Sequence, residues 1–413
     1  MSSIVLNKIQ LSSKLLAIAA IISTMAIYNP SDLCPSYITR LTLCIEMGCC
    51  FGVLLLSDFK WISKNSILFI CIPISYFVIN LFDYNRIVGI QLGLGIVPPL
   101  LCCSFVKSNV IYKSYEYFIN YIYIISLLSL LALLDFILNL NILPHKMVPF
   151  YMEESKVFYV DYFFSYIYIN ADSFRLCGLC NEPGFWGTLS SLALVSSNCK
   201  FNTWKSRIIL IGGILTLSVA FFSIIIIYYV LRSFRKNPLK LIYLFIGAYC
   251  IVGLFIYLDN PVTNRFIERF EYDSKNGKFK GDNRGNRDLD EMFDRMFDTS
   301  ELYFGKGTGF VKYKYPHGVA GAKRMFVDWG LIGFLLTYGI LLAVLLYYSR
   351  NSYNAMSYVI CFAASIYQRA DVFTLGYLLL IIGGIVNLNR QKSVHIFNNK
   401  SYKYSYNEHI ICK

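Results

Sequence analysis

The sequence has few charged residues for its length. Asp, Glu, Lys and Arg make up 15% of the 413 residues, whereas 56% are hydrophobic. A soluble domain carries about 25% charged residues, so the composition argues against a soluble enzyme or binding module. Apolar runs of about 20 residues recur along the chain, and the mean hydropathy is +0.52. The sequence therefore predicts a polytopic, all-α membrane protein.

A framework of paired cysteines is also missing. Most of the 13 cysteines lie inside apolar runs, as Cys49 and Cys50 do, and behave there as small hydrophobic residues. Cys177 and Cys180 form a C-x-x-C in a polar loop, without a second such pair and without a nearby histidine. This spacing disfavours a zinc site and leaves a local disulfide or two free thiols as alternatives. We expect neither a metal nor a cofactor.

The net charge of +13 is not accompanied by a basic segment interleaved with aromatic residues. Lysine and arginine instead gather in short stretches between apolar runs, as in the cytoplasmic loops of membrane proteins. We therefore expect membrane lipid, and not nucleic acid, as a partner. The first apolar run lacks a small-residue cleavage site, which predicts a retained first span. The basic residues at both ends of the chain predict that both termini are cytoplasmic.

The apolar runs predict about twelve transmembrane helices in one domain, residues 1–413. Two polar segments, 141–183 and 258–323, are predicted to be loops on the outer side, the second directly before the tenth span. The sequence shows no internal repeat and no segment long enough for a separate soluble domain. The predicted helices cover about 15–29, 38–57, 66–82, 87–106, 118–140, 184–198, 208–217, 218–231, 239–257, 325–348, 356–367 and 373–387.

The apolar segment from Ile208 to Leu231 allows two topologies. A single helix of its 24 residues would cross the membrane and would place Arg232 and the later basic loops outside. Two short helices hinged near Leu217 and Ser218 would keep those residues in the cytoplasm. Each would be about 18 Å long, which is tolerable where neighbouring helices bury it. We predict the hinged pair.

Residues 283–333 form the longest polar stretch of the chain. Within it, apolar residues recur at the spacing of an amphipathic helix over about 288–298. Asp288, followed by Glu291 three residues later, resembles a capping box. We expect this helix to lie on the outer membrane surface with its apolar face down, where it would cover the lipid entrance.

Two short motifs in this stretch each have two interpretations. Gly305–Gly309 reads GKGTG, but Ser300 stands where a phosphate-binding loop has its first glycine. A turn that closes the loop over the bundle is therefore favoured. Asp288 and Asp290 match the D-x-D metal motif of nucleotide-sugar glycosyltransferases. Acidic residues are also favoured at the start of a helix, and we prefer this structural interpretation.

Three arginines and a histidine on the predicted outer side are candidate site residues: Arg175, Arg284, Arg287 and His317. A guanidinium can bind a diphosphate with two parallel hydrogen bonds, and a neutral imidazole can accept the proton of a hydroxyl group. Two arginines and a base at one membrane face suit transfer from a lipid diphosphate without a metal. Each of these residues is individually compatible with an ordinary surface position.

Two acidic residues, Glu46 and Asp135, fall within predicted spans. An unpaired carboxylate is costly at membrane depth, so each is a functional candidate by default. Asp135 lies late in its span and has the alternative of reaching the outer interface. Neither residue has an assigned role.

Several of these segments together resemble a known family, the O-antigen and capsule polysaccharide polymerases of the Wzy type, which are related to the O-antigen ligases. Two departures from the family pattern are Val219 in place of an arginine after the hinge, and Gly318 in place of an asparagine beside the histidine. The segments that carry the resemblance are R-x-x-G-x-x-x-E-P-G (Arg175 to Gly184), the hinge at 215–218, F-G-x-G-x-G (Phe304 to Gly309), His317, and D-W-G-L-I-G (Asp328 to Gly333).

This resemblance implies a GT-C-like glycosyltransferase at the outer face of a bacterial inner membrane. The donor would be a growing glycan on undecaprenyl diphosphate, the acceptor a lipid-linked repeat unit, and a chain-length regulator a further partner. Two alternatives are a ligase, which transfers the glycan to lipid A core, and a flippase for the same lipid. A flippase is expected to show two equivalent halves, and this sequence does not.

The resemblance also assigns roles to individual residues. Arg175 and either Arg284 or Arg287 would hold the donor diphosphate. His317 would act as the general base or would orient the acceptor. Glu182 and Gly307 are further substrate-binding candidates, with Glu182 orienting Arg175 or an acceptor hydroxyl.

Overall fold

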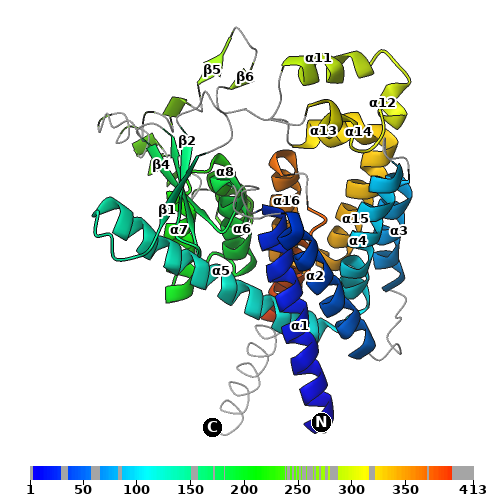
Figure 1. Ribbon diagram of the computed structural model, residues 1–413, viewed down its shortest axis with the longest axis horizontal. Coiled ribbons are helices and arrows are strands. Elements are labelled where there is room, and N and C mark those ends of the chain that lie inside the picture. Colours follow the sequence, from blue (N-terminus) through cyan, green and yellow to red (C-terminus); the bar gives the residue numbers. More distant parts are fainter. Residues whose placement is uncertain are drawn as a thin grey trace, which may run out of the picture.

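The computed structural model describes most of the chain and is mostly helical (Figure 1). Among its described residues, three helices are long and apolar enough to cross a membrane: Leu6–Met25, Ser108–Ile137 and Ala322–Ser349. The protein is therefore a helical membrane protein, as predicted. The described residues are 3–28, 36–56, 66–81, 86–149, 157–170, 173–180, 182–237, 287–315, 321–369 and 372–392, with scattered residues between 239 and 279.

The helices follow the predicted order. The final described helix covers residues 375–392. The predicted span at about 239–257 lies mostly outside the described residues. The labelled helices that correspond to predicted spans are α1 (Ser3–Tyr28), α2 (Ser36–Leu56), α3 (Ser66–Asn80), α4 (Arg86–Phe105), α5 (Ser108–Ile137), α6 (Pro183–Ser196), α7 (Trp204–Leu215), α8 (Val219–Lys236), α14 (Ala322–Phe334), α15 (Ile340–Ser349) and α16 (Tyr353–Gln368).

The ambiguous apolar segment forms two helices, which confirms the hinged pair. Helix α7 ends at Leu215 and α8 begins at Val219. Leu217, between them, has a φ of 45°, in the left-handed region that non-glycine residues rarely adopt. We call residues 216–218 the helix break.

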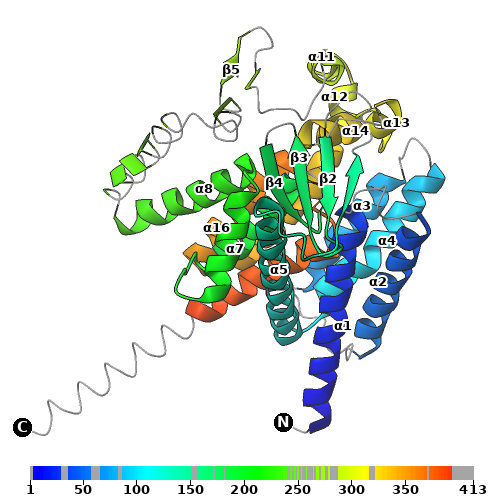
Figure 2. The ribbon, with the colours of Figure 1, turned by 60° about the vertical axis from the view of Figure 1, so that its left-hand side comes forward.

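Basic residues meet at one end of the helices, which we call the basic end. Arg390 of the last helix donates to the side chain of Asn109, at the start of α5. Gln391, next in that helix, accepts a hydrogen bond of 2.5 Å from Asn198, just after α6. Arg232 of α8 donates to the Asn198 carbonyl over 2.9 Å. The helix pair α7–α8 therefore starts and finishes at the same end, and the N-terminus of α1 points toward this end as well (Figures 1 and 2).

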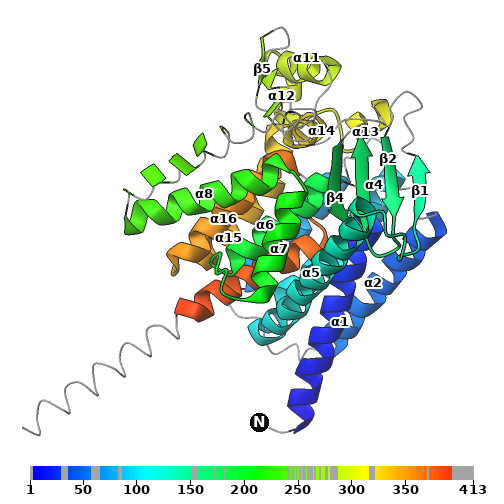
Figure 3. The ribbon, with the colours of Figure 1, turned by 90° about the vertical axis from the view of Figure 1, so that its left-hand side faces the viewer.

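A four-stranded antiparallel sheet lies at the other end, where the sequence analysis expected only a loop. Its order is β1 (Lys146–Pro149), β2 (Val157–Asp161), β3 (Tyr166–Asn170) and β4 (Ser173–Gly178). Aromatic and β-branched residues dominate β2 and β3, which favours a pleated, half-buried surface. Strand β4 contacts α5, α6 and α7, and the sheet lies at the end of the molecule away from the N-terminus of α1 (Figure 3). The prediction of an all-α fold is therefore wrong for this segment.

The predicted amphipathic helix exists as α11 (Arg287–Met296), but its position differs from the expectation. Leu289 and Met296 are fully buried against Val311 and Val327, in a small core separate from the main one. The apolar face thus packs on the protein rather than on lipid, because α14 supplies an apolar partner. The helix also begins one residue before Asp288, so Asp288 is not its N-cap.

Two short helices, α12 (Glu301–Phe304) and α13 (Phe310–Lys314), follow α11 and precede α14. The predicted tenth span is present, but its backbone is irregular. Gly330 in α14 has a φ of 63° and a ψ of −174°, which divides the helix into two parts. A π-helical turn, η1 (Leu335–Gly339), then leads into α15. Before Gly330, Val327 packs against Leu289 of α11 and Val311 of α13, and after Gly330 the helix continues into α15.

Candidate functional site

The structure places the predicted site residues in two groups. Arg175 on β4 and Glu182 before α6 lie close together at the end of the helices away from the basic end. Gly307 lies in the glycine turn beside α14. Arg284 and His317 fall outside the described residues, as does the side chain of Arg287, whose backbone begins α11. The predicted roles of these last three residues therefore stay predictions.

Arg175 is held by the helix break. Its Nε donates to the carbonyl oxygen of Thr216 over 2.9 Å, and its Nη2 donates to that of Leu217 over 3.2 Å. These carbonyls lie at the end of α7, where the regular helical hydrogen bonds stop and backbone groups need other partners. A guanidinium carried by β4 therefore supplies the missing donors at the hinge. The break and the sheet thus fix the position of this cation.

Two glycines near the start of α6 let other segments of the chain pack closely against this helix. A Cβ at Gly187 would lie 2.7 Å from Ser218 Cβ and 2.8 Å from Thr216 Oγ1. A Cβ at Gly184 would lie 2.7 Å from a terminal nitrogen of Arg369. The two glycines therefore allow the helix break and a second arginine to approach the first turns of α6.

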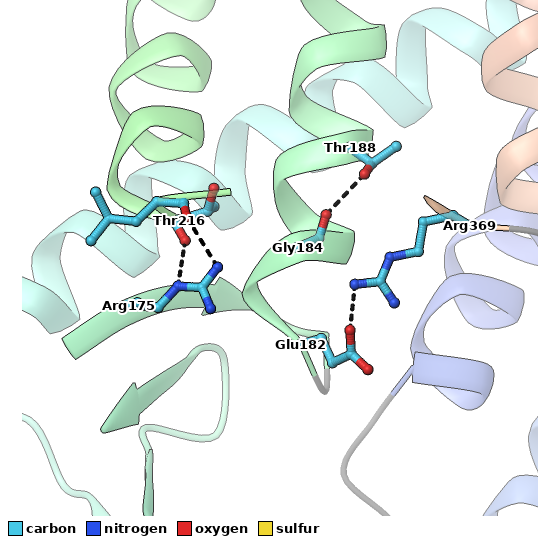
Figure 4. A network of polar contacts seen from close by, with 7 residues as sticks. Arg175, Glu182, Gly184, Thr188, Thr216 and Arg369 are labelled. Carbon is cyan, nitrogen blue, oxygen red and sulfur yellow. Dashed lines mark hydrogen bonds and ion pairs between the residues drawn. The ribbon is translucent and has the colours of Figure 1, made fainter. Parts of the chain in front are cut away.

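Arg369 is a site residue that the sequence analysis missed. It follows α16, and its guanidinium forms an ion pair with the Glu182 carboxylate. The same guanidinium stands 5.9 Å from the centre of the Phe185 ring, within the range of a cation–π contact. Arg175 and Arg369 lie on either side of the turn that begins α6 (Figure 4). A weak signal was present in the sequence, an isolated arginine in a short turn between two apolar runs on the predicted outer side.

Cys177 and Cys180 are buried free thiols between these charges. Burial is the largest influence on both and raises the pKa of each thiol. Arg175 lowers the pKa of Cys177, Arg369 lowers that of Cys180, and Glu182 raises the pKa of both. All three charged groups therefore lie close to this one turn, on opposite sides of it. Of the two alternatives for the C-x-x-C, the structure shows free thiols.

We expect Cys177 and Cys180 to react slowly with a water-soluble maleimide at pH 8. Raised pKa values keep both thiols protonated there, and the thiolate is the reactive form. Mass spectrometry of labelled peptides, with and without prior unfolding, measures the difference. Rapid modification of either residue in the folded protein would contradict the buried arrangement.

The glycine turn, Gly305–Gly309, is hydrogen-bonded to α14 through Asp328. The backbone N–H of Gly307 donates to the carbonyl oxygen of Asp328 over 3.0 Å. The Asp328 carboxylate, which is buried, accepts from the N–H groups of Gly309 at 3.2 Å and Val311 at 2.8 Å. These amides bind protein oxygens, so the turn that closes the loop is confirmed over a phosphate-binding loop.

The other acidic candidates lie away from the start of α6. Asp290 and Asp135 bind other parts of the protein. Asp290 pairs with Lys323 of α14 over 2.7 Å, which favours the structural interpretation of the D-x-D. Asp135 accepts hydrogen bonds from the Ile142 N–H and the Tyr162 hydroxyl and so ties α5 to the segment around the sheet. Glu46 is buried in α2. Within the described part of the chain, no three His, Cys, Asp or Glu side chains gather as metal ligands.

No protein-family model, no curated protein and no solved structure matches this chain. The chemistry of the group at the start of α6 is therefore the basis for assigning a function. Two guanidinium groups and a carboxylate, on three different segments, surround one helix end. Guanidinium groups in such an arrangement can bind the oxygens of a dianionic ligand.

Proposed function

We propose that the protein is a polysaccharide polymerase of the O-antigen or capsule type. It transfers a growing glycan from undecaprenyl diphosphate to a sugar hydroxyl of a lipid-linked repeat unit. The proposal includes a GT-C-like arrangement of about twelve spans in a bacterial inner membrane, with both termini cytoplasmic. The basic end then faces the cytoplasm, because lysine and arginine are retained there.

The proposal rests on one observation: Arg175 and Arg369 stand on either side of the start of α6. Helices α6 and α16 each run between the basic end and this group, so the two arginines stand at the opposite membrane face. A polyprenyl diphosphate presents its charge at that depth, and charge-assisted bonds to arginine stabilise it as a leaving group. Arg284 or Arg287 adds to this set, and His317 serves as base or orients the acceptor.

The lengths of the helices support a lipid-linked substrate. Helix α6 has 14 residues and α7 has 12. At 1.5 Å per residue they are about 21 Å and 18 Å long, whereas the hydrocarbon core is about 30 Å thick. Both have one end at the basic end, so the arginines are set below the outer membrane surface. The diphosphate of a membrane-anchored donor reaches this level more readily than a soluble sugar nucleotide does.

A reconstituted reaction tests the proposal. Purified protein in detergent is mixed with a synthetic repeat unit on undecaprenyl diphosphate, and the products are resolved by gel electrophoresis. We expect a ladder of longer glycans, and its absence would contradict the polymerase. A parallel reaction with lipid A core as acceptor separates the two enzymes. Transfer to the core without a ladder would identify a ligase.

A further inference from the structure

The ion pair between Glu182 and Arg369 is asymmetric. The side chain of Glu182 is 51% exposed, whereas that of Arg369 is 12% exposed. A guanidinium that has been largely removed from water needs an anionic or hydrogen-bonding partner, since its own hydration is lost. Solvent, and therefore a ligand, reaches the acidic partner of this pair.

The guanidinium of Arg369 is held in place by neighbouring residues of α6. Arg369 lies against the backbone of Gly184, where a Cβ would collide with it, and near the ring of Phe185. Glu182 occupies the N-cap position of α6 but makes no side-chain capping bond to that helix. The carboxylate is therefore directed toward Arg369, and no capping bond to α6 has to break when it leaves that partner.

We propose that the donor diphosphate displaces the Glu182 carboxylate from Arg369. Arg369 then binds the diphosphate together with Arg175, and Glu182 becomes the base that receives the proton of the acceptor hydroxyl. This inference rests on the proposed function. A carboxylate bound to a guanidinium is stabilised in its charged form and accepts a proton less readily, so donor binding activates the base.

The reaction balances as a single displacement. The acceptor hydroxyl oxygen forms a bond to the anomeric carbon of the donor glycan, and its proton passes to Glu182. The bond between that carbon and the phosphate oxygen breaks, and the electron pair leaves with undecaprenyl diphosphate. Arg175 and Arg369 hold the charge that the leaving group develops. When the diphosphate departs, Glu182 returns its proton to water and pairs with Arg369 again. His317 orients the acceptor in this scheme.

Replacing Glu182 should raise the affinity for the diphosphate and lower the rate of transfer. A purely structural role for Glu182 predicts no such pair of opposite effects. The binding probe is undecaprenyl diphosphate without a sugar, titrated against purified protein by microscale thermophoresis. We expect Glu182→Gln to bind the probe more tightly, by about three- to tenfold, because a competing charge has been removed. The same variant should form the ladder about a hundredfold more slowly, because the base is lost. Arg369→Gln should bind the probe about tenfold more weakly.

The exposed carboxylate of Asp298, just after α11, supplies a control. Asp298→Asn likewise removes one carboxylate charge and should change neither measurement. Weaker binding of the probe by Glu182→Gln would overturn the exchange and would assign Glu182 a purely structural role. A Glu182→Gln ladder as fast as that of the wild type would also overturn it.

The two proposals fail in different ways. If the wild type forms a ladder and Glu182→Gln matches it, the exchange is wrong and the polymerase stands. If the wild type forms no ladder in any reaction, but Glu182→Gln binds the probe more tightly and Arg369→Gln more weakly, the diphosphate site stands. The polymerase is then wrong.

Discussion

Replacing Arg175 with alanine is expected to lower the rate of glycan transfer by about a thousandfold, the effect of removing a preorganised donor to developing negative charge. The guanidinium is already oriented by its bonds to the carbonyls of Thr216 and Leu217, so little reorganisation is needed when substrate binds. The ladder assay gives the rate, and titration with undecaprenyl diphosphate gives the affinity. Both should fall.

Two further variants separate this catalytic loss from damage to the fold. Arg175→Lys keeps the charge but cannot span two carbonyls with a planar fork, so its rate should fall between those of the alanine variant and the wild type. Arg232 also donates to a backbone carbonyl, that of Asn198, but does so at the basic end. Arg232→Gln should retain the wild-type rate. A rate near the wild-type value in Arg175→Ala, with the fold intact, would remove Arg175 from the mechanism.

Gly330→Ala is expected to have the largest effect on stability, a loss of at least about 3 kcal/mol. The φ of 63° and ψ of −174° fall in a region that glycine alone adopts readily. A Cβ there would also lie 2.5 Å from the Tyr303 carbonyl oxygen and close to the backbone nitrogen of Gly305. Backbone atoms cannot rotate away, so the hydrogen bonds between the glycine turn and α14 must break. Thermal unfolding in detergent, followed by tryptophan fluorescence, measures the loss.

Gly339 provides the comparison within the same membrane helix. Its φ is −63°, and a Cβ would meet nothing nearer than Leu335 Cδ2 at 3.5 Å. Gly339→Ala should therefore be neutral or stabilising by up to about 1 kcal/mol, since alanine has the higher helix propensity. Equal unfolding temperatures for the two variants would show that the backbone at Gly330 is not constrained as described.

Parts of this fold follow directly from the sequence. Low charge and repeated apolar runs predict the membrane class, because every charge in lipid is costly. The helix break near Leu217 could be predicted because the basic residues on both sides of the segment have to stay on one side of the membrane. The spacing of Leu289 and Met296 predicted an amphipathic helix, since helical periodicity depends only on the local sequence.

Other features depend on partners that periodicity does not identify. The apolar face of α11 could meet lipid or protein, and only the tertiary structure shows Val327 beneath it. The four strands fall in a segment whose polar residues predicted a loop, although each strand pairs with its neighbour in the sequence and β2 and β3 are rich in aromatic and β-branched residues. The contact of Glu182 with Arg369 joins positions separated by 187 residues. Long-range contacts of this kind leave no local sequence pattern, which is why the candidate site was predicted only in part.

The helix break has a consequence for how the chain enters the membrane. Helices α7 and α8 expose the carbonyls of Thr216 and Leu217 where they meet, and lipid offers no donor for these groups. Arg175 supplies the donors and is synthesised 41 residues before Thr216. In the proposed topology, β4 therefore has to cross the bilayer before the hairpin of α7 and α8 reaches its final depth. The order of translation allows this sequence of events, and we expect the hairpin to complete its insertion only after β4 has formed.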